Sequence, residues 1–281
     1  MEQAPPVVLT IAGFDPSSGA GVTADIKTIA AHGCYGVACI TALTVQSTSG
    51  VRRVVPVSPD LVAGTLKELT SDIEIAAVRM GMLGSGKVVR AVGDFLAKEK
   101  LPNVVLDPIL KSSSGTDLLD RSGVRLLMEK LLRLATVVTP NVDEASALTG
   151  LAVTNPEQMR AAATKLHAMG ATAVVITGGH LEKAIDLLSF TSKRGVEQEI
   201  FKSVRQRSNS THGTGCAFAA AMACHLARGR GLPEAVLLAK AYVAAAIANA
   251  HPMGRGTGPV HHLYRMYQQR RVVIADPEPV N

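Results

Sequence analysis

The sequence predicts an α/β fold in which a mostly parallel sheet is covered by helices on both faces. Short apolar runs alternate along the chain with longer segments of helical periodicity, which is the pattern of repeated β-α-β units. The apolar runs show no alternation with polar residues, as expected for strands that are buried on both faces. Hydrophobic residues make up 47% of the 281 residues and aromatic residues only 3%, so aliphatic side chains must fill the core.

Apolar runs bounded by turn residues are expected to form the strands. The run at 52–58 contains Pro56, whose missing N–H interrupts a hydrogen-bond ladder, so we expect an edge strand there. The runs at 184–192 and 195–204 are separated by a short turn and predict a hairpin. The other expected strands are 7–13, 37–43, 75–81, 103–108, 135–140 and 173–179.

Capping residues mark the ends of the helices between these strands. Gly33 follows the first helical segment and ends it. Ser58 and Asn155 are expected N-caps, and each is followed by a proline at the first helical position. The expected helices are 20–33, 58–72, 86–100, 120–132, 141–150, 155–170, 215–229 and 232–250. We expect one domain over residues 1–281, with its core at about 6–259 and a C-terminal tail at 260–281.

Composition argues against several classes of function. The formal charge of +6 is spread along the chain without a basic stripe interleaved with aromatic residues, so we expect no nucleic-acid partner. The N-terminal segment has no basic region before its short apolar run, so we expect no membrane association and a cytoplasmic location. The four cysteines form no C-x-x-C pair, which argues against structural zinc and, in the cytoplasm, against disulfides.

Two glycine-rich segments resemble nucleotide-binding motifs but lack an essential group. The segment GAGVTA at 19–24 matches the dinucleotide fingerprint, yet no acidic residue follows about 20 positions later to bind a ribose. The segment GMLGSGKV at 81–88 matches a P-loop, except that Val88 stands where a hydroxyl must bind Mg²⁺. We therefore expect neither an NAD site nor a P-loop.

Polar residues follow the carboxyl ends of successive expected strands. In an open parallel sheet, ligands bind in the crevice beyond these ends. Acidic residues, amides and glycines gathered at one sheet edge suit a nucleotide, a metal and a small polar substrate. The polar residues of this set are Asp25, Thr44, Gln46, Asp107, Asn141, Glu144 and Thr177.

The segment STHGTGC at 210–216 leads into an alanine-rich helix. Gly213 and Gly215 allow a tight turn with exposed N–H groups at the start of that helix. The unpaired donors and the helix dipole favour an anion at such a position. The pattern is equally compatible with an anion hole for a phosphoryl group and with an ordinary helix cap.

Seven short motifs identify a family when they are taken together. They are GxDPSSGAGxxAD, ITALTVQST, GML, VLDP, TPNxxEA, GGH and THGTGC. With them the chain resembles, over most of its length, the hydroxymethylpyrimidine and phosphomethylpyrimidine kinases of thiamine biosynthesis, within the ribokinase-like superfamily. The resemblance implies a three-layer α/β/α fold, ATP as co-substrate, Mg²⁺ and a homodimer. The implied reaction phosphorylates 4-amino-5-hydroxymethyl-2-methylpyrimidine to its monophosphate and then to the pyrophosphate.

The resemblance also assigns roles to individual residues. Asp25 and Gln46 would hydrogen-bond the aminopyrimidine, although without the resemblance we would expect Asp25 to be a solvated helix residue. Asp107 and Glu144 would face the Mg²⁺–phosphate region, Glu144 through water. The residues that would line the pyrimidine pocket are Gly13, Ala20, Thr44, Met82 and Ile109. Those that would lie near the nucleotide are Asn141, Thr177 and Lys240.

The turn before the alanine-rich helix supplies the implied catalytic groups. Gly213, Thr214 and Gly215 would form the anion hole. Cys216 occupies the position at which most ribokinase-like enzymes carry an aspartate base. Because a helix N-terminus favours a thiolate, we expect Cys216 to act as a weak base. We expect no proton-transfer role for His212.

The sequence departs from the family pattern at two positions and leaves alternative functions open. Thr177 stands where these kinases often have lysine, and Phe14 replaces a commoner small or polar residue. The alternatives are a pyridoxal or pyridoxine kinase of the same superfamily and a non-catalytic nucleotide-binding regulator. The polar segment 202–212 is a candidate lid over the phosphates.

Overall fold

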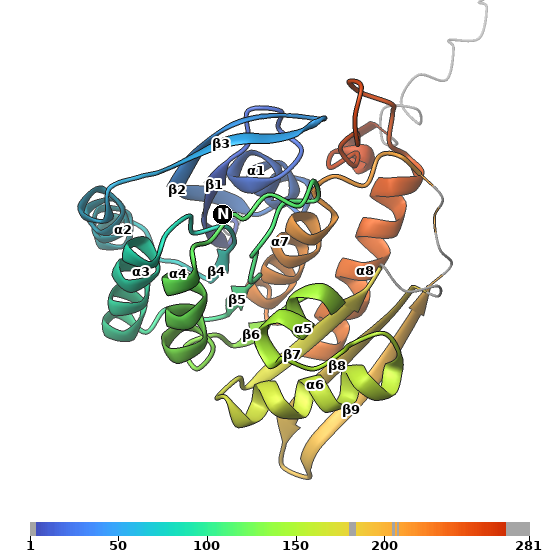
Figure 1. Cartoon of the computed structure of the whole chain (residues 1–281). Coiled ribbons are helices and arrows are strands. Elements are labelled where there is room, and N and C mark those ends of the chain that lie inside the picture. The colour runs from blue at the N-terminus through green and yellow to red at the C-terminus, as the bar shows by residue number, and fades with distance from the viewer. Residues whose placement is uncertain (1–3, 180–183, 204–205, 207, 268–281) are drawn as a thin grey trace, which may run out of the picture.

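The computed structural model shows three layers, with one mixed sheet between two layers of helices (Figure 1). It describes residues 4–179, 184–203, 206 and 208–267. The nine strands follow the order β3-β2-β1-β4-β5-β6-β7-β8-β9. Their bounds are β1 Val7–Phe14, β2 Tyr35–Ser47, β3 Gly50–Pro56, β4 Ala77–Met80, β5 Val104–Leu106, β6 Val137–Val138, β7 Ala173–Gly178, β8 Ala184–Ser192 and β9 Gly195–Ser203.

The six strands from β2 to β7 run parallel in the order β2-β1-β4-β5-β6-β7, as the uninterrupted apolar runs predict. β3 pairs antiparallel with β2 at one edge, which confirms the edge position expected from Pro56. β8 and β9 form the expected hairpin beside β7. The chain places β2 on one side of β1 and β4 on the other. The carboxyl end of β1 is therefore a point at which a parallel sheet opens a crevice for ligands.

Two apolar cores fill the space between the sheet and the helices. The first lies between the sheet and α2 to α6, and the second between the sheet and α1, α7 and α8. The expected N-caps Ser58 and Asn155 both accept a hydrogen bond from the third residue beyond them. The helices are α1 Gly21–Ala31, α2 Pro59–Asp72, α3 Gly86–Glu99, α4 Arg121–Leu126, α5 Val142–Thr149, α6 Pro156–Ala168, α7 Thr214–Ala227 and α8 Leu232–Ala248.

Two elements differ from the prediction. The segment expected as one helix at 120–132 is a six-residue α-helix followed by a π-helical turn over Leu127–Leu131. The wider turn adjusts the register of a leucine-rich segment, which buries Leu126, Leu127, Leu131 and Leu132. Strand β2 also extends four residues beyond the expected end, to Ser47, because it continues as a ribbon with β3. Among the described residues, no helix is long and apolar enough to cross a membrane.

Candidate active site

A buried ionic network lies below the carboxyl ends of β1, β4 and β5. Arg79 of β4 is fully buried, and its two terminal nitrogens contact Asp25 Oδ2 at 3.1 Å and Asp107 Oδ2 at 2.8 Å. Thr10, which pairs with Arg79 across β1 and β4, donates a 2.6 Å hydrogen bond to Asp25 Oδ2. Asp25 Oδ1 is buried without a partner. One guanidinium thus fixes two predicted site carboxylates that lie far apart in the sequence.

Burial makes ionisation of these carboxylates costly. It raises the pKa of Asp25 to about 6, although Arg79 and Thr10 favour the charged form and Asp107 opposes it. Burial likewise raises the pKa of Asp107 against the opposing effect of Arg79. A predicted solvated position for Asp25 is therefore wrong, since its side chain is completely enclosed. A guanidinium shared by two buried carboxylates keeps charge at the site that would otherwise be lost to protonation.

The turn at 213–216 lies directly against this network. Gly213 is the N-cap of α7 with φ +82°, and a Cβ at Gly215 would lie 3.9 Å from Asp107 Oδ2. The second and third residues of a helix have N–H groups without intrahelical acceptors. Here these residues are Gly215 and Cys216, and Cys216 begins an 11-residue buried stretch of α7. The backbone can therefore offer donors to an anion next to Asp107.

The surroundings of Cys216 oppose the expected thiolate. Burial raises the pKa of Cys216 to about 12, although Arg79 favours the charged form; the carboxylates of Asp25 and Asp107 raise it further. We expected the helix start to lower this pKa. Burial and two neighbouring carboxylates outweigh that effect, so the surroundings favour the protonated thiol.

Glu144 lies at the start of α5, within electrostatic range of Asp107. Asn141 and Glu144 form a capping box: Glu144 N–H donates to Asn141 Oδ1, and Asn141 N–H donates to Glu144 Oε2, both at 2.9 Å. Burial, and next the charge of Asp107, raise the pKa of Glu144 to about 8. Glu144 thus caps α5, and its carboxylate also senses the charge of a second acidic group.

The three predicted nucleotide-binding residues are linked by a chain of contacts around β7 and β8. Asn141 forms an isolated parallel bridge with Thr177 of β7. Thr177 pairs across the sheet with Asp186 of β8, which accepts hydrogen bonds from Gly178 N–H at 3.0 Å and from Lys240 Nζ at 2.5 Å. Lys240 of α8 is thus neutralised by a carboxylate, a partner that the sequence did not indicate.

Most residues expected to line the pyrimidine pocket gather beyond the ends of β1, β2 and β4. Met82 belongs to a small apolar cluster with Ala42 and Leu118, against which Ile109 packs. A Cβ at Gly13 would lie 2.9 Å from Met82 Sδ, so Gly13 lets the thioether approach the backbone of β1. Three of the expected pocket residues, Gly13, Met82 and Ile109, are thus brought together around one small apolar cluster.

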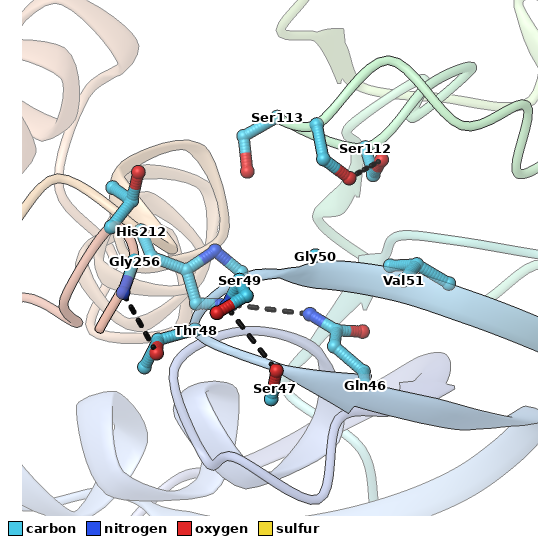
Figure 2. Close-up of a pocket in the computed structure, with 12 residues that line it drawn as sticks. Gln46, Ser47, Thr48, Ser49, Gly50, Val51, Ser112, Ser113, His212 and Gly256 are labelled. Carbon is cyan, nitrogen blue, oxygen red and sulfur yellow. Dashed lines mark hydrogen bonds between the residues drawn. The ribbon is translucent and has the colours of Figure 1, made fainter. Parts of the chain in front are cut away.

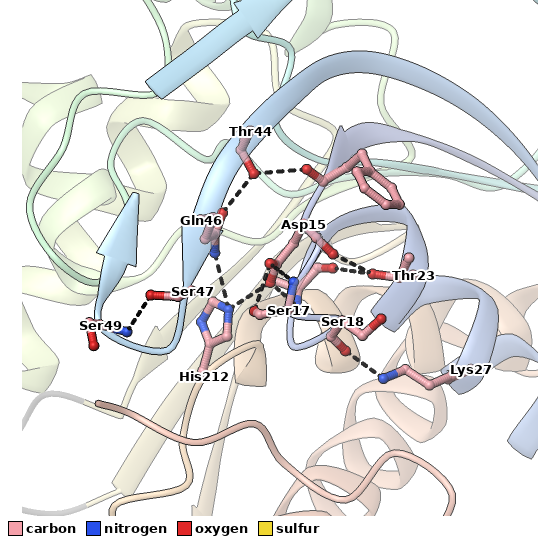
Figure 3. A network of polar contacts seen from close by, with 12 residues as sticks. Asp15, Ser17, Ser18, Thr23, Lys27, Thr44, Gln46, Ser47, Ser49 and His212 are labelled. Atoms are coloured by element: carbon pink, nitrogen blue, oxygen red, sulfur yellow. Dashed lines mark hydrogen bonds and ion pairs between the residues drawn. The ribbon is translucent and has the colours of Figure 1, made fainter. Parts of the chain in front are cut away.

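Ala20, Thr44 and Gln46 belong to a polar network that Figure 3 shows. Ala20 N–H donates to Asp15 Oδ2 at 2.9 Å, and Asp15 Oδ2 lies 2.8 Å from His212 Nε2. Thr44 Oγ1 lies 3.2 Å from Gln46 Oε1 and donates to the Phe14 carbonyl at 2.9 Å. The network joins the loop after β1, the end of β2 and the turn before α7.

Sequence reasoning missed three residues of the site, which are Arg79, Asp15 and His212. Arg79 is a single charged residue in the fully buried strand β4, and a charge inside an apolar run is a signal that was available. Asp15 lies within a motif that we quoted, but the sequence does not show that it faces His212. That pair is separated by 197 positions, so only the fold brings it together.

A cavity of about 140 Å³ opens beside this polar network. Figure 2 shows that it lies between the turn joining β2 to β3, the serine-rich loop at 112–114 and the segment around Gly256. Gln46 and His212 form one wall, and the remaining walls consist largely of serine and threonine hydroxyls. Gln46 is the one predicted site residue in its lining.

Comparison with known proteins adds independent information. The family model described as phosphomethylpyrimidine kinase matches residues 15–261. A hydroxymethylpyrimidine/phosphomethylpyrimidine kinase of Haemophilus influenzae is 40% identical over 260 residues, which cover 91% of this chain and 96% of the relative. The thiamine biosynthesis bifunctional protein ThiED of Geobacter sulfurreducens is 44% identical over 258 residues, and the match spans 91% of this chain but about half, 52%, of that longer protein.

Solved structures share the fold over nearly the whole chain. The ADP complex of Bacillus subtilis pyridoxal kinase matches with a TM-score of 0.84 at 34% identity, covering 94% of this chain and 100% of that one. The phosphomethylpyrimidine kinase of Clostridium difficile 630 matches with a TM-score of 0.77 at 34% identity, covering 86% of this chain and 99% of that one. These matches confirm the ribokinase-like fold. The chain belongs to the phosphomethylpyrimidine kinase family.

Proposed function

We propose that the protein transfers the γ-phosphoryl group of ATP to 4-amino-5-hydroxymethyl-2-methylpyrimidine and then phosphorylates the monophosphate to the pyrophosphate. The observation that carries this proposal is the start of α7, where backbone donors lie beside Asp107 in a chain of this kinase family. The ring would lie between Gln46 and the small apolar cluster around Met82. Asn141, Thr177 and Lys240 would lie along the nucleotide.

The chemistry follows from positioning and charge neutralisation. Phosphoryl transfer passes through a loose transition state in which negative charge spreads over the transferred oxygens. The N–H groups at Gly215 and Cys216 would stabilise that charge, in a site where Arg79 already lies behind the carboxylate of Asp107. Because bond formation to the hydroxyl oxygen is little advanced, its proton needs only weak assistance. A protonated thiol at Cys216 is compatible with such a reaction.

Asp107 and Glu144 fit a role in holding Mg²⁺. Carboxylate oxygens are the protein ligands that Mg²⁺ prefers, and it usually takes only one or two of them alongside water and phosphate oxygens. Burial first, and next the charge of Asp107, raise the pKa of Glu144, and a cation near this pair would offset the repulsion between the two carboxylates. When bound, the ion would neutralise the ATP phosphates. Within the described ranges, no group of three or more acidic, histidine or cysteine side chains forms a complete metal cage.

Replacing Glu144 by glutamine should stabilise the metal-free protein at alkaline pH. The native pKa of about 8 exceeds the ordinary value of 4.5, so the folded state holds a proton that the unfolded state releases. Stability due to this group is therefore lost as the pH rises from about 4.5 to 8. Glutamine keeps the helix cap and carries no charge.

We expect Glu144→Gln to match the wild type in free energy of unfolding at pH 5. At pH 8.5 in EDTA we expect it to be about 2–3 kcal/mol more stable. Urea denaturation measures both values, and added MgCl₂ should narrow the difference at pH 8.5 by stabilising the wild-type carboxylate. Glu157→Gln, which changes an acidic residue in the first turn of α6, is the matched control. A stability gain of Glu144→Gln that is independent of pH would contradict the raised pKa of Glu144.

Cys216→Ser and Cys216→Ala should both keep kcat within about tenfold of the wild type. Loss of a general base would lower kcat by about 10²- to 10⁴-fold. The reason for the small expected effect is the pKa of about 12, which leaves almost no thiolate at neutral pH. Steady-state kinetics with saturating ATP and pyrimidine measure kcat. Cys224→Ala, at a fully buried position further along α7, controls for the loss of a packed sulfur. A loss of 100-fold or more in both Cys216 variants would restore the base role.

A substrate panel tests the proposed function directly. Purified protein is incubated with ATP, Mg²⁺ and either the hydroxymethylpyrimidine, its monophosphate, pyridoxal or pyridoxine, and the products are separated by chromatography. We expect kcat/KM for the pyrimidine to exceed that for pyridoxal and both phosphorylation steps to proceed. Pyridoxal as the better substrate would favour the alternative kinase, which the likeness to the Bacillus subtilis enzyme makes worth measuring. Failure to transfer phosphate to any of these alcohols would favour a regulator.

We further propose that the protein is a cytoplasmic homodimer. Leu43 of β2 lies opposite Val55 of β3 in the ribbon, and both are exposed, as are Ile40 and Val45. Four exposed aliphatic side chains on neighbouring strands are unusual for a free surface, which supports a second copy of the chain as their partner. Sedimentation equilibrium of the wild type and of Leu43→Lys measures the assembly, and a monomer for both would contradict it.

A further inference from the structure

His212 connects two residues on opposite sides of the polar network. Its Nε2 lies 2.8 Å from Asp15 Oδ2 and 3.3 Å from the Gln46 amide nitrogen. A Cβ at Gly19 would lie 2.2 Å from His212 Cδ2, so the absence of a side chain at Gly19 lets the ring lie flat against this loop. The ring position is thereby fixed between Asp15 and Gln46 (Figure 3).

The hydrogen bonds of Asp15 place a proton on Nε2 of His212. Asp15 is 3% exposed, and its Oδ1 accepts from the N–H and hydroxyl of Ser17 at 2.8 and 2.7 Å. Burial opposes ionisation of Asp15, but the hydrogen bonds from His212 and Ser17 outweigh it and lower its pKa. A carboxylate only accepts hydrogen bonds. The 2.8 Å contact with His212 is therefore an Nε2–H donating to Asp15.

That proton decides which end of the Gln46 amide can face His212. An Nε2–H and an amide N–H are both donors and cannot bond each other. The hydroxyl of Thr44 has one proton, which goes to the Phe14 carbonyl at 2.9 Å, so Thr44 can only accept from Gln46. Rotating the amide by half a turn exchanges its oxygen and nitrogen, which are nearly indistinguishable in shape. After this rotation the amide N–H donates to Thr44 Oγ1. The amide oxygen then accepts the longer, 3.3 Å branch of a three-centre hydrogen bond from His212 Nε2–H, whose 2.8 Å branch goes to Asp15.

We propose that Asp15 and His212 are positioning residues that fix the Gln46 amide with its oxygen toward His212 and its nitrogen toward Thr44. In this orientation Gln46 keeps one oxygen lone pair and one N–H for a ligand. An aminopyrimidine presents an amine donor beside a ring-nitrogen acceptor, and a carboxamide binds that pair through two hydrogen bonds. By fixing Gln46, Asp15 and His212 thus favour a ring that has an amino group beside a ring nitrogen. This inference rests on the proposed function.

The position of the cavity supports this assignment. Gln46 and His212 both line it, and they extend from β2 and from the turn before α7 toward the same space in Figure 2. A ligand in contact with Gln46 would therefore reach an amide whose orientation is set by the adjacent His212. The rest of the lining carries hydroxyls rather than charged groups, which suits a neutral heterocycle.

The test compares two substrates that differ by one group: the hydroxymethylpyrimidine and its analogue without the 4-amino group. We expect His212→Ala to raise KM for the aminopyrimidine about tenfold, with kcat within about twofold and KM for the analogue and for ATP nearly unchanged. The preference of the wild type for the amino compound should therefore disappear. His212→Gln, whose amide nitrogen replaces the Nε2 donor, should restore most of it.

Controls separate this role from a structural one. Thermal unfolding of each variant establishes that it folds, and His251→Ala, at an exposed histidine, should change neither KM. A parallel rise of KM for both substrates in His212→Ala, or an unchanged preference, would overturn the inference. If the wild type fails to phosphorylate the pyrimidine, the proposed function fails instead. Calorimetric binding of the same two compounds to wild type and His212→Ala then gives the preference without turnover.

Discussion

Arg79→Met is expected to lower the free energy of unfolding by about 3–5 kcal/mol at pH 8, because removing one partner of a buried ion pair leaves uncompensated charge. Arg79 is fully buried and neutralises both Asp25 and Asp107. Methionine fills much of the same volume without a charge, so packing losses are small. The destabilisation therefore measures the free-energy cost of two buried carboxylates without a cation, and not the cost of a cavity.

The effect should depend on pH in a defined direction. Without Arg79, the native pKa of Asp25 rises beyond its present value of about 6, whereas the unfolded value stays near the ordinary one. The folded variant then holds protons that its unfolded chain releases, so its stability falls as the pH rises from about 4 through the native pKa. We expect the deficit relative to the wild type to be smaller at pH 5 than at pH 8.

Two further variants make this result specific. Arg79→Met combined with Asp25→Asn removes one of the two uncompensated buried charges. It should recover part of the lost free energy of unfolding at pH 8. Arg79→Lys keeps the charge but cannot bond two carboxylates as a planar fork, so an intermediate stability is expected. Urea denaturation at both pH values measures all of them. An equal deficit for Arg79→Met at pH 5 and pH 8 would refute the electrostatic account.

Kinase activity should fall as well. Asp107 loses the group that orients its Oδ2, and Cys216 loses the positive charge nearest to it. Removal of a preorganised electrostatic group from an active site typically costs about 10²- to 10³-fold in kcat. We expect a loss of that order in Arg79→Met at pH 8 and 15 °C, where the variant remains folded by circular dichroism.

Local signals in the sequence predicted most of the fold. Ser58 and Asn155 cap the helices that they were expected to begin, and Pro56 lies in an edge strand. These outcomes depend on neighbours within a few positions of the chain. The π-helical turn at Leu127–Leu131 was not predictable in the same way, because tertiary packing of leucines sets its register.

The site was predictable where a motif carries the chemistry and less so where the fold creates it. Gly215 and Asp107 were both assigned from motifs, and the structure places them side by side. The partner of Lys240 is Asp186, which comes from a hairpin strand with no motif. Cys216 shows the same limit, since its pKa depends on burial and on the carboxylates of Asp25 in α1 and of Asp107 after β5. Contacts across long sequence separations decide these properties.

Gly213→Ala is expected to lower kcat by about 10²- to 10³-fold, the cost of removing a preorganised oxyanion donor. Gly213 has φ +82°, a conformation that L-residues other than glycine seldom adopt. A Cβ there would lie 1.8 Å from the carbonyl oxygen of Gly19. Because that obstacle is backbone, a rotamer change cannot relieve it, and the turn or the loop after β1 must move.

Movement of either segment affects both halves of the site. The turn carries the N–H groups of Gly215 and Cys216, and the loop after β1 carries Asp15 and the N-cap residue Ala20. A Cβ at Gly213 would overlap the backbone of Gly19, so the two segments already lie against each other and a shift of one moves the other. We therefore expect KM for the pyrimidine to rise along with the fall in kcat, whereas a defect confined to the anion hole would change kcat alone.

Gly229→Ala separates this effect from backbone strain. Gly229 has φ +75°, close to that of Gly213, but a Cβ there meets nothing within 4 Å. Alanine at either position incurs the cost of the left-handed conformation, about 1 kcal/mol, which urea denaturation measures. Only Gly213→Ala adds the collision. Near-normal kcat in Gly213→Ala would mean that the turn at 213–216 is a helix cap and that the transferred phosphoryl group is stabilised elsewhere, whereas a loss specific to Gly213 ties catalysis to the backbone of this turn.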